Sequence, residues 1–168
     1  MLALILVIAG ILLRIIPHAP NFTPVAAIAL FSGAYLNKRS AFIVPLVLMI
    51  ISDLLIGLHD VVIFTWGGFI LVTFFGLVIK KHKNIVTIFS GSFASSLLFY
   101  LVSNFGVWVM GWYPHTQEGL IKCYVLALPF LRNFTLATLL YTLAFFGIYE
   151  LVAQGIKNTR YARILLTG

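Results

Sequence analysis

The chain has little charge, few acidic residues and a single cysteine, and each of these shortages excludes a class of protein. Only 9% of its 168 residues are charged, 62% are apolar, and the mean hydropathy is +1.10. Soluble domains carry roughly a quarter charged residues, so this composition excludes a water-soluble globular domain. Because Cys123 is the single cysteine, the chain forms neither an internal disulfide nor a cysteine-cluster metal site.

Catalytic signatures are missing as well. The sequence contains no G-x-S-x-G, H-E-x-x-H or S-x-x-K motif and no P-loop. We therefore expect no enzymatic activity, no cofactor and no nucleotide hydrolysis by this chain. If the chain takes part in active transport, an ion gradient or a separate ATPase has to supply the energy.

Apolar runs of bilayer length, separated by short polar breaks, fill nearly the whole chain. This pattern predicts an all-α fold, a polytopic membrane helix bundle that occupies residues 1–168 as one domain. We expect six transmembrane helices, at residues 2–16, 24–36, 41–58, 61–79, 85–110 and 134–154. Thr23 and Pro24 predict the start of the second helix, as N-cap and first helical residue. The alternative is that residues 24–36 form a re-entrant half-helix, which leaves five spans.

Residues 112–133, between the fifth and sixth expected helices, have mixed character. Their apolar part, residues 120–131, is too short to span a bilayer and contains Lys122 and Pro129. We expect a short interfacial helix there, lying on the outer face of the membrane.

The basic residues lie in the breaks between apolar runs, so they indicate membrane orientation rather than a nucleic-acid partner. With six spans, Lys and Arg divide eight to three between the two sides. The richer side holds Lys38, Arg39, Lys80, Lys81, Lys83, Lys157, Arg160 and Arg163, and the other holds Arg14, Lys122 and Arg132. The positive-inside rule then predicts a multi-pass protein of the bacterial inner membrane with both termini in the cytoplasm.

Two charged residues fall within the apolar region, near its outer side. Asp53 lies about five positions from the end of its helix, roughly 8 Å deep at about 1.5 Å per residue, and Arg14 lies at a similar depth. A lone charge inside a membrane costs roughly 2.5–3.5 kcal/mol, so we expect these side chains to approach within hydrogen-bonding distance. For Asp53, a structural ion pair, a group at the floor of a solute pocket and a proton relay all stay open.

The outer side also supplies a candidate solute-binding site, because a pocket needs a few convergent polar groups in an apolar wall. Residues 112–133 are expected to act as a lid. An interfacial aromatic belt explains outer aromatic residues such as Trp66 and Trp112, and a stacking wall for a flat solute is the alternative. The residues expected to bind a solute are Arg14, His18, Asn21, Asp53, Asn104 and Trp108.

Histidines and carboxylates on the same side raise the question of a metal site, since both are ligands for zinc and similar metals. They lack the spacing of a known ligand motif, so no metal is expected. The residues considered are His18, His59, His115, Asp53 and Asp60.

Small residues at four-residue spacing mark places where helices approach closely in lipid. The pairs are Ala29 with Gly33, Gly91 with Ser95, and Ser92 with Ser96. Packing within the chain is one explanation for them, and a docking face for a partner subunit is the other.

Several short blocks of the sequence form a recognisable pattern. RxxPHxPNFTP at residues 14–24 is followed by SDL at 52–54, NFGVW at 104–108, YP at 113–114, CY at 123–124 and PF at 129–130. This pattern resembles a family of small bacterial polytopic membrane proteins of unknown function, and the resemblance covers nearly the whole chain. It implies no activity.

In size, expected topology and outer polar cluster, the chain is also similar to the substrate-binding subunits of energy-coupling-factor vitamin transporters. That resemblance implies six helices, an outward-facing pocket and docking to separate ATPases through a small-residue helix face. On this chain, Ala29 and Gly33 would have to provide that face.

These observations lead to three hypotheses. The first is a membrane subunit that binds or transports a small, partly aromatic solute, such as a vitamin or cofactor precursor. This solute is expected to be near-neutral or zwitterionic, because three basic and three acidic residues balance on the outer side: Arg14, Lys122, Arg132, Asp53, Asp60 and Glu118. The second is a structural or assembly subunit of a larger membrane complex, favoured if the small-residue faces are exposed. The third, a membrane-embedded enzyme, is favoured only if Asp53 and the histidines meet at one cavity.

Overall fold

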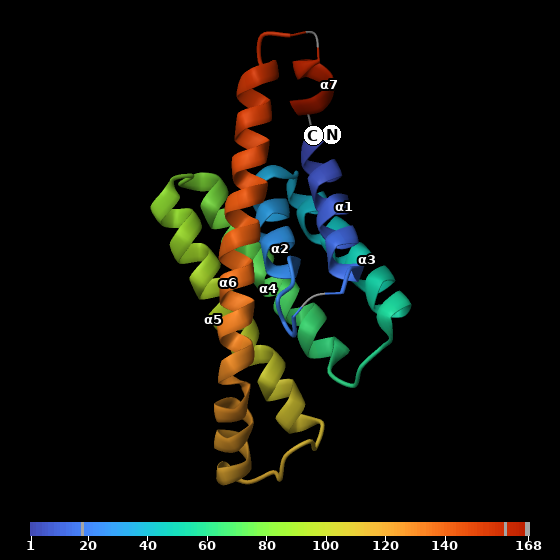
Figure 1. The fold of residues 1–168 in the computed structure, drawn as a ribbon, viewed down its shortest axis with the longest axis vertical. Coiled ribbons are helices and arrows are strands. Elements are labelled where there is room, and N and C mark those ends of the chain that lie inside the picture. Colours follow the sequence, from blue (N-terminus) through green and yellow to red (C-terminus); the bar gives the residue numbers. More distant parts are fainter. Residues whose placement is uncertain (18, 160, 167–168) are drawn as a thin grey trace.

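In the computed structural model, which describes residues 1–17, 19–159 and 161–166, every regular element is an α-helix, as the composition predicts. The bundle is elongated along its longest helix (Figure 1). Seven helices follow one another along the described chain: α1 (Leu2–Ile15), α2 (Val25–Tyr35), α3 (Lys38–Ile56), α4 (Val62–Lys81), α5 (Ile85–Val109), α6 (Gln117–Ile156) and α7 (Ala162–Leu166).

Four of these helices, α3, α4, α5 and α6, are long and apolar enough to cross a membrane. Helix α1 has 14 residues and α2 has 11, which gives them lengths of roughly 21 and 16 Å at about 1.5 Å per residue. The hydrocarbon core of a bilayer is about 30 Å thick. The structure is therefore consistent with a membrane protein, whereas the expected count of six spans is not confirmed.

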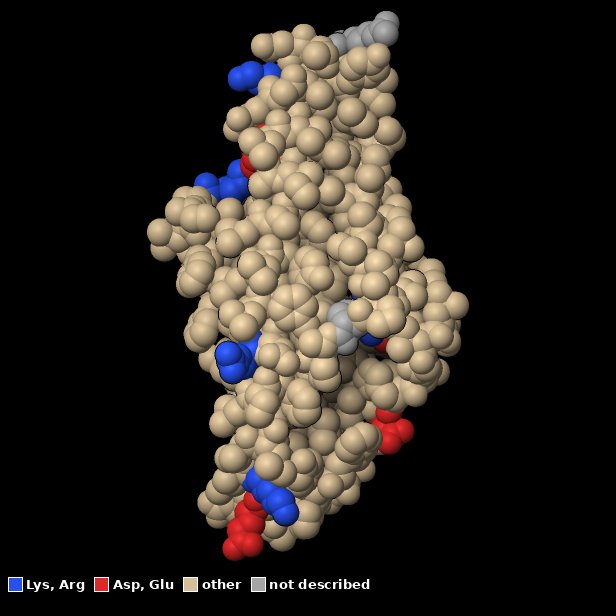
Figure 2. Space-filling model, in the orientation of Figure 1, with Lys and Arg blue, Asp and Glu red and all other residues tan. Residues whose placement is uncertain are grey.

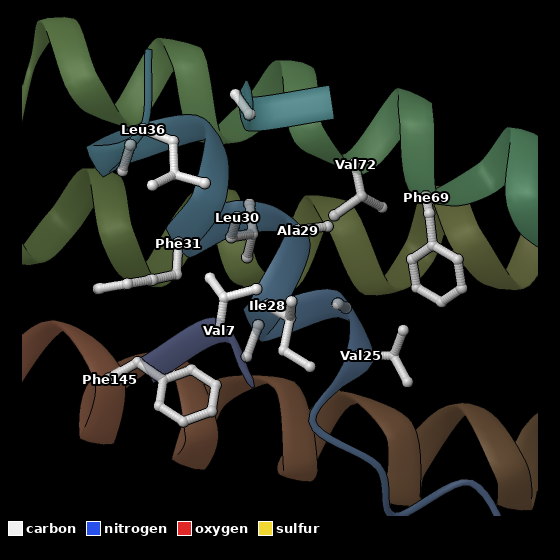
Figure 3. Close-up of a cluster of buried hydrophobic side chains, with 14 of the residues drawn as sticks. Val7, Val25, Ile28, Ala29, Leu30, Phe31, Leu36, Phe69, Val72 and Phe145 are labelled. Atoms are coloured by element: carbon white, nitrogen blue, oxygen red, sulfur yellow. The ribbon is translucent and has the colours of Figure 1, made fainter. Parts of the chain in front are cut away.

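Helix α2 lies at the centre of the bundle. Every residue from Val25 to Ala34 is buried, on all faces of the helix. Its side chains point toward α4 on one side and toward α1 and α6 on the other (Figure 3). A helix that is apolar all round is stable where other elements surround it. Because α2 is enclosed by protein, its shortness exposes no unsatisfied helix end to lipid.

Two glycines bring α2 and α4 into backbone contact. A Cβ atom added at Gly33 would lie 2.5 Å from the carbonyl oxygen of Thr73 and 2.8 Å from the Cα atom of Gly76. Small residues permit such an approach, which increases van der Waals contact between membrane helices. Ala29, one turn earlier, is 1% exposed. The Ala29 and Gly33 pair therefore packs inside the chain.

The small residues of α5 are buried too. Gly91, Ser92, Ser95 and Ser96 all belong to the buried face of this helix. The hydroxyls of Ser92 and Ser96 donate to the backbone carbonyls of Ile88 and Ser92, one turn earlier. The three small-residue pairs, all within the described chain, are thus used for internal packing and are not exposed for docking.

The segment expected as a separate interfacial helix is instead the first part of α6. This helix runs for 40 residues and contains Pro129 in its interior. Tyr100 of α5 donates to the carbonyl of Tyr124 at 2.6 Å, and the Tyr124 hydroxyl donates to the carbonyl of Leu101 at 2.8 Å. These bonds attach residues 120–131 to α5. The segment is too short to span a bilayer by itself, and it continues directly into the rest of α6.

One end of the bundle, called here the basic end, carries the starts of α3 and α5 and the end of α6. Lys83 forms an ion pair there with Glu150, and Tyr35 donates to the same carboxylate at 2.5 Å. The Met1 amino group donates to the Leu165 carbonyl at 3.2 Å. The start of α1 and helix α7 therefore lie side by side at this end (Figure 1). Of the basic residues expected there, Arg160 and the side chain of Arg163 lie outside the described part of the chain.

The opposite end, called here the cavity end, carries the loops at residues 16–24, 57–61 and 110–116. The hairpin of α5 and α6 extends beyond the other helices at this end (Figure 1). On the face shown in Figure 2, most of the surface between the two ends carries neither basic nor acidic side chains, as expected for a surface that contacts lipid.

Candidate binding cavity

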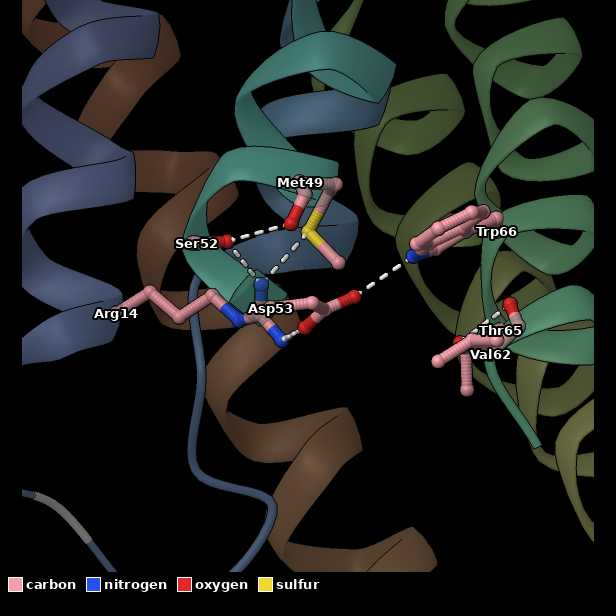
Figure 4. A network of polar contacts seen from close by, with 7 residues as sticks. All are labelled: Arg14, Met49, Ser52, Asp53, Val62, Thr65 and Trp66. Carbon is pink, nitrogen blue, oxygen red and sulfur yellow. Dashed lines mark hydrogen bonds and ion pairs between the residues drawn. The ribbon is translucent and has the colours of Figure 1, made fainter. Parts of the chain in front are cut away.

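An ion pair joins α1 to α3 at the cavity end. Arg14, in the last turn of α1, pairs through Nη2 with Oδ1 of Asp53 on α3. Its Nη1 donates to the Ser52 hydroxyl and to the Met49 sulfur, the latter at 3.3 Å. Figure 4 shows the Arg14 side chain reaching across to this turn of α3. The prediction that Arg14 and Asp53 approach within hydrogen-bonding distance is confirmed.

Both oxygens of the Asp53 carboxylate have partners. Oδ2 accepts from Nε1 of Trp66 on α4 at 2.7 Å, and the residue is 1% exposed. A buried carboxylate is stable only when it is paired and hydrogen-bonded. Here the guanidinium of Arg14 and the indole of Trp66 fill that role, so the network links α1, α3 and α4. Trp66 is thus more than a member of an aromatic belt.

A cavity of about 760 Å³ lies beside this network, within the range of roughly 300–1,000 Å³ that is usual for small-molecule sites. Its wall comes from α1 to α6 and the loops of the cavity end, and most of it is apolar or aromatic. The polar residues in the wall are Arg14, Asn21, Thr23, His59, Thr65, Tyr100, Ser103, Asn104 and Tyr113.

Several of these polar groups keep hydrogen-bonding capacity that the described protein does not use. The Thr23 hydroxyl is buried and has no partner among the described residues, as is also true of the hydroxyls of Ser32, Ser95 and Thr142, which do not line the cavity. The Asn104 side chain donates to the Tyr100 carbonyl at 2.8 Å, which occupies its amide nitrogen and not its amide oxygen. Unused donors and acceptors in a hollow are costly unless water or a ligand satisfies them.

Of the six residues expected to bind a solute, the structure places three in the cavity wall: Arg14, Asn21 and Asn104. Asp53 does not line the cavity, because its carboxylate is enclosed between Arg14 and Trp66, to which it is bonded. Trp108 is also outside the wall, since its Nε1 donates to the Pro114 carbonyl at 3.0 Å and closes the turn before α6. His18 lies outside the described residues.

The segment expected as a lid, residues 112–133, forms part of the cavity wall and is not a separate element. Trp112, Tyr113, Cys123, Leu126, Ala127, Phe130 and Leu131 contribute to the lining. Most of them belong to the continuous helix α6, which has no break at which a flap could hinge.

The loop between α1 and α2 forms another part of the wall and is fixed on α6. Asn21 adopts a left-handed backbone conformation with φ of 58°, which asparagine tolerates better than most residues. The Asn133 side chain of α6 donates to the Pro20 carbonyl at 3.2 Å. The rings of Phe22 and Tyr141 lie 6.0 Å apart between centroids. These contacts hold the loop in place over the hollow.

The expected N-cap of α2 is not present. The helix begins at Val25 with Pro24 in the capping position, and no side chain caps it. The amide of Ile28 bonds to the Pro24 carbonyl at 2.9 Å, which makes the first intrahelical hydrogen bond. Thr23 therefore lines the cavity instead of capping the helix.

Among the residues that the structure describes, the histidines and Asp53 do not meet at one cavity. His59 lines the cavity, whereas Asp53 does not. His115 lies at the tip of the α5–α6 hairpin, where its Nε2 atom is 2.9 Å from the Trp108 carbonyl oxygen. Within residues 1–17, 19–159 and 161–166, no group of three or more His, Cys, Asp or Glu is arranged to hold a metal ion.

Sequence reasoning missed three phenylalanines of the cavity wall. Phe99 of α5 lies 4.9 Å from Phe69 of α4 and stacks on Phe134 of α6 at 4.8 Å, measured between ring centroids. All three line the cavity. Phenylalanine is frequent throughout the apolar helices, so its position in the sequence gives no signal that these three converge.

Comparisons with known proteins identify relatives by sequence pattern and not by activity. No curated protein and no solved structure matches the chain. A family model described as "Family of unknown function (DUF6580)" matches residues 1–161. This match spans nearly the whole chain, including the Arg14 to Pro24 block and the lining of the cavity. The chain belongs to this family of unknown function.

Proposed function

We propose that the protein is an integral membrane subunit that binds a small solute for transport across a bacterial inner membrane. The observation that carries this proposal is the cavity of about 760 Å³ at one end of an otherwise apolar bundle. Helix packing alone does not require a hollow of this size with polar residues such as Asn21, Ser103 and Asn104 in its wall. A binding site does, because such groups orient a solute while apolar walls desolvate it.

The wall suits a partly aromatic solute, such as a vitamin or cofactor precursor. Phe69, Phe99 and Phe134 contact one another and form an aromatic, apolar side of the wall, and an aromatic solute packs favourably against such a surface. In this proposal the chain has no catalytic role and carries no cofactor.

The proposed topology has six spans, with both termini in the cytoplasm and the cavity facing outward. The basic end supports this orientation, because Lys38, Arg39, Lys80, Lys81 and Lys83 belong to it. The start of α1 and helix α7 lie together there, which fits an even number of crossings. In this topology the two short helices cross the bilayer with support from longer neighbours. Helix α2 is enclosed by them, and α1 packs on their surface.

A separate ATPase or an ion gradient would energise transport. By analogy with energy-coupling-factor subunits, Ala29 and Gly33 would form the surface that docks the ATPase. Both residues are instead enclosed by α4 and its neighbours. An energising partner would therefore have to contact a different surface of the chain.

Solute binding can be tested on protein purified from native membranes. Mass spectrometry of the extracted fraction should identify a small molecule that copurifies with the wild-type protein. The variants Asn104→Ala and Thr23→Val should retain less of it, because both residues line the cavity. The control Glu118→Gln changes an exposed residue outside the wall and should retain the wild-type amount. A wild-type protein that carries and binds no small molecule would refute the proposal.

The structural-subunit hypothesis gains no support from the small-residue pairs, because they are buried in the chain's own packing. The enzyme hypothesis required that Asp53 and the histidines share a cavity, and the described residues do not meet that condition.

A further inference from the structure

The charge of the cavity wall narrows the class of solute, and this inference rests on the proposed function. Among the described residues of the wall, Arg14 is the one that carries a permanent charge. Its side chain is 15% exposed, whereas that of Asp53 behind it is 2% exposed. The ion pair therefore turns its positive side toward the hollow and its negative side toward α4.

Arg14 has donors left over for a solute. A guanidinium carries five N–H groups. Nη1 bonds to Ser52 and Met49, and Nη2 bonds to Asp53. Nε has no partner among the described residues. A carboxylate accepts well from such a fork, because charge-assisted and bidentate hydrogen bonds to arginine are strong.

The acidic residues that would favour a cationic or zwitterionic solute lie elsewhere. Asp60 and Glu118 are exposed and do not line the cavity. Three basic and three acidic residues at this end predicted a near-neutral solute. Of these six residues, Arg14 is the one that lines the cavity, so the wall itself has no such balance. A positively charged group in the hollow would find no acidic side chain among the described residues of the wall, so it would gain no ion pair there.

We propose that the solute is an aromatic carboxylate. Its carboxylate accepts hydrogen bonds from Arg14, and its ring packs against the exposed part of Phe99, because Phe69 and Phe134 are each only 5% exposed. Asp53 keeps Arg14 neutralised when the cavity holds no anion, so the site does not contain an uncompensated charge. Asp53 also competes for the guanidinium, which limits the gain from the acid group to about tenfold to a hundredfold in affinity.

Matched pairs of aromatic acids and their amides test this inference with purified protein in lipid nanodiscs. The probes are nicotinate with nicotinamide, indole-3-acetate with indole-3-acetamide, and 4-aminobenzoate with 4-aminobenzamide, with binding followed by saturation-transfer NMR. The acid of at least one pair should bind about tenfold or more tightly than its amide. Equal binding of acid and amide in every pair that binds would overturn the inference.

Variants assign the preference to Arg14. Arg14→Gln alone leaves Asp53 buried without its cation, so the double variant Arg14→Gln/Asp53→Asn removes both charges. It should lose the preference for acids and keep binding of the amides. Arg132→Gln is the matched control, because Arg132 lies at the same end but outside the wall. A preference that survives in the double variant would overturn the role of Arg14.

The solute that copurifies from native membranes decides the case if no acid of the panel binds. High-resolution mass spectrometry of that solute should give a formula that contains a carboxylic acid and an aromatic ring. A solute without an acidic group overturns this inference and leaves the proposed function standing. Absence of any solute contradicts the proposed function itself, so the two failures are distinguishable.

Discussion

The ion pair between Arg14 and Asp53 should be strongly coupled in a double-mutant cycle. Asp53→Leu leaves the guanidinium without its anion, and Arg14→Met leaves a carboxylate that is 2% exposed without its cation. Removing one partner of a buried pair costs about 3–5 kcal/mol, whereas removing both with apolar groups of similar volume costs far less. The double variant still leaves the indole N–H of Trp66 without its acceptor, which costs about 1–3 kcal/mol. The expected coupling energy is therefore at least about 3 kcal/mol.

This coupling can be measured by equilibrium unfolding in mixed micelles with increasing dodecyl sulfate, followed by tryptophan fluorescence and circular dichroism. The exposed pair of Lys83 and Glu150 is a matched control, because its side chains are 42% and 38% exposed. Exposed ion pairs contribute about 0.2–1 kcal/mol, so the control cycle should show little coupling. If the two cycles give the same coupling, or if the double variant is less stable than both single variants, the buried pair does not stabilise the bundle as argued.

Three other predictions follow from the packing and the topology. Gly33→Ala should destabilise the protein by about 1–3 kcal/mol in the same unfolding assay, because the added methyl group meets the backbone of α4. Gly67→Ala, in the same kind of helical position with open space around it, should be neutral or stabilising by up to about 1 kcal/mol. Glu150→Gln should lower stability by about 1 kcal/mol or less, and high salt should shrink the difference, as expected for an exposed ion pair. A membrane-impermeant thiol reagent should label a cysteine placed at Pro20 and spare one at Lys38 in intact cells, and the reverse pattern would invert the proposed orientation.

The sequence predicts the helical membrane class and the ion pair for the same physical reason. Water is absent from the apolar region, so backbone groups must bond within helices and charged side chains must find partners. Arg14 and Asp53 are the two charged residues expected at a similar depth in the membrane, and the structure joins them in an ion pair. The sequence gives no comparable constraint on Trp66, because an indole N–H near an interface is satisfied by water equally well.

The continuity of α6 and the position of α2 were beyond sequence reasoning. Pro129 and Lys122 favour a break before the sixth expected helix, but the segment is continuous with that helix in the structure, and two tyrosine hydrogen bonds attach it to α5. The uniform apolarity of α2 predicts that the helix avoids water. It does not predict whether lipid or protein surrounds the helix. Which aromatic residues share a wall depends on how helices rotate against one another, and periodic apolar runs rich in phenylalanine do not specify that rotation.

The enclosed position of α2 also constrains the order in which the protein is assembled. At 11 residues, α2 is too short to be held across a bilayer by itself, and isolated helices of this length are marginally stable. The helix that contacts its backbone, α4, is synthesised later. A nascent chain therefore carries an apolar segment that has no stable place until α4 is inserted. In chains truncated after residue 60, a cysteine at Ala29 should react with a water-soluble thiol reagent, and in chains truncated after residue 110 it should be protected. Protection in both would show that α2 is enclosed before α4 exists.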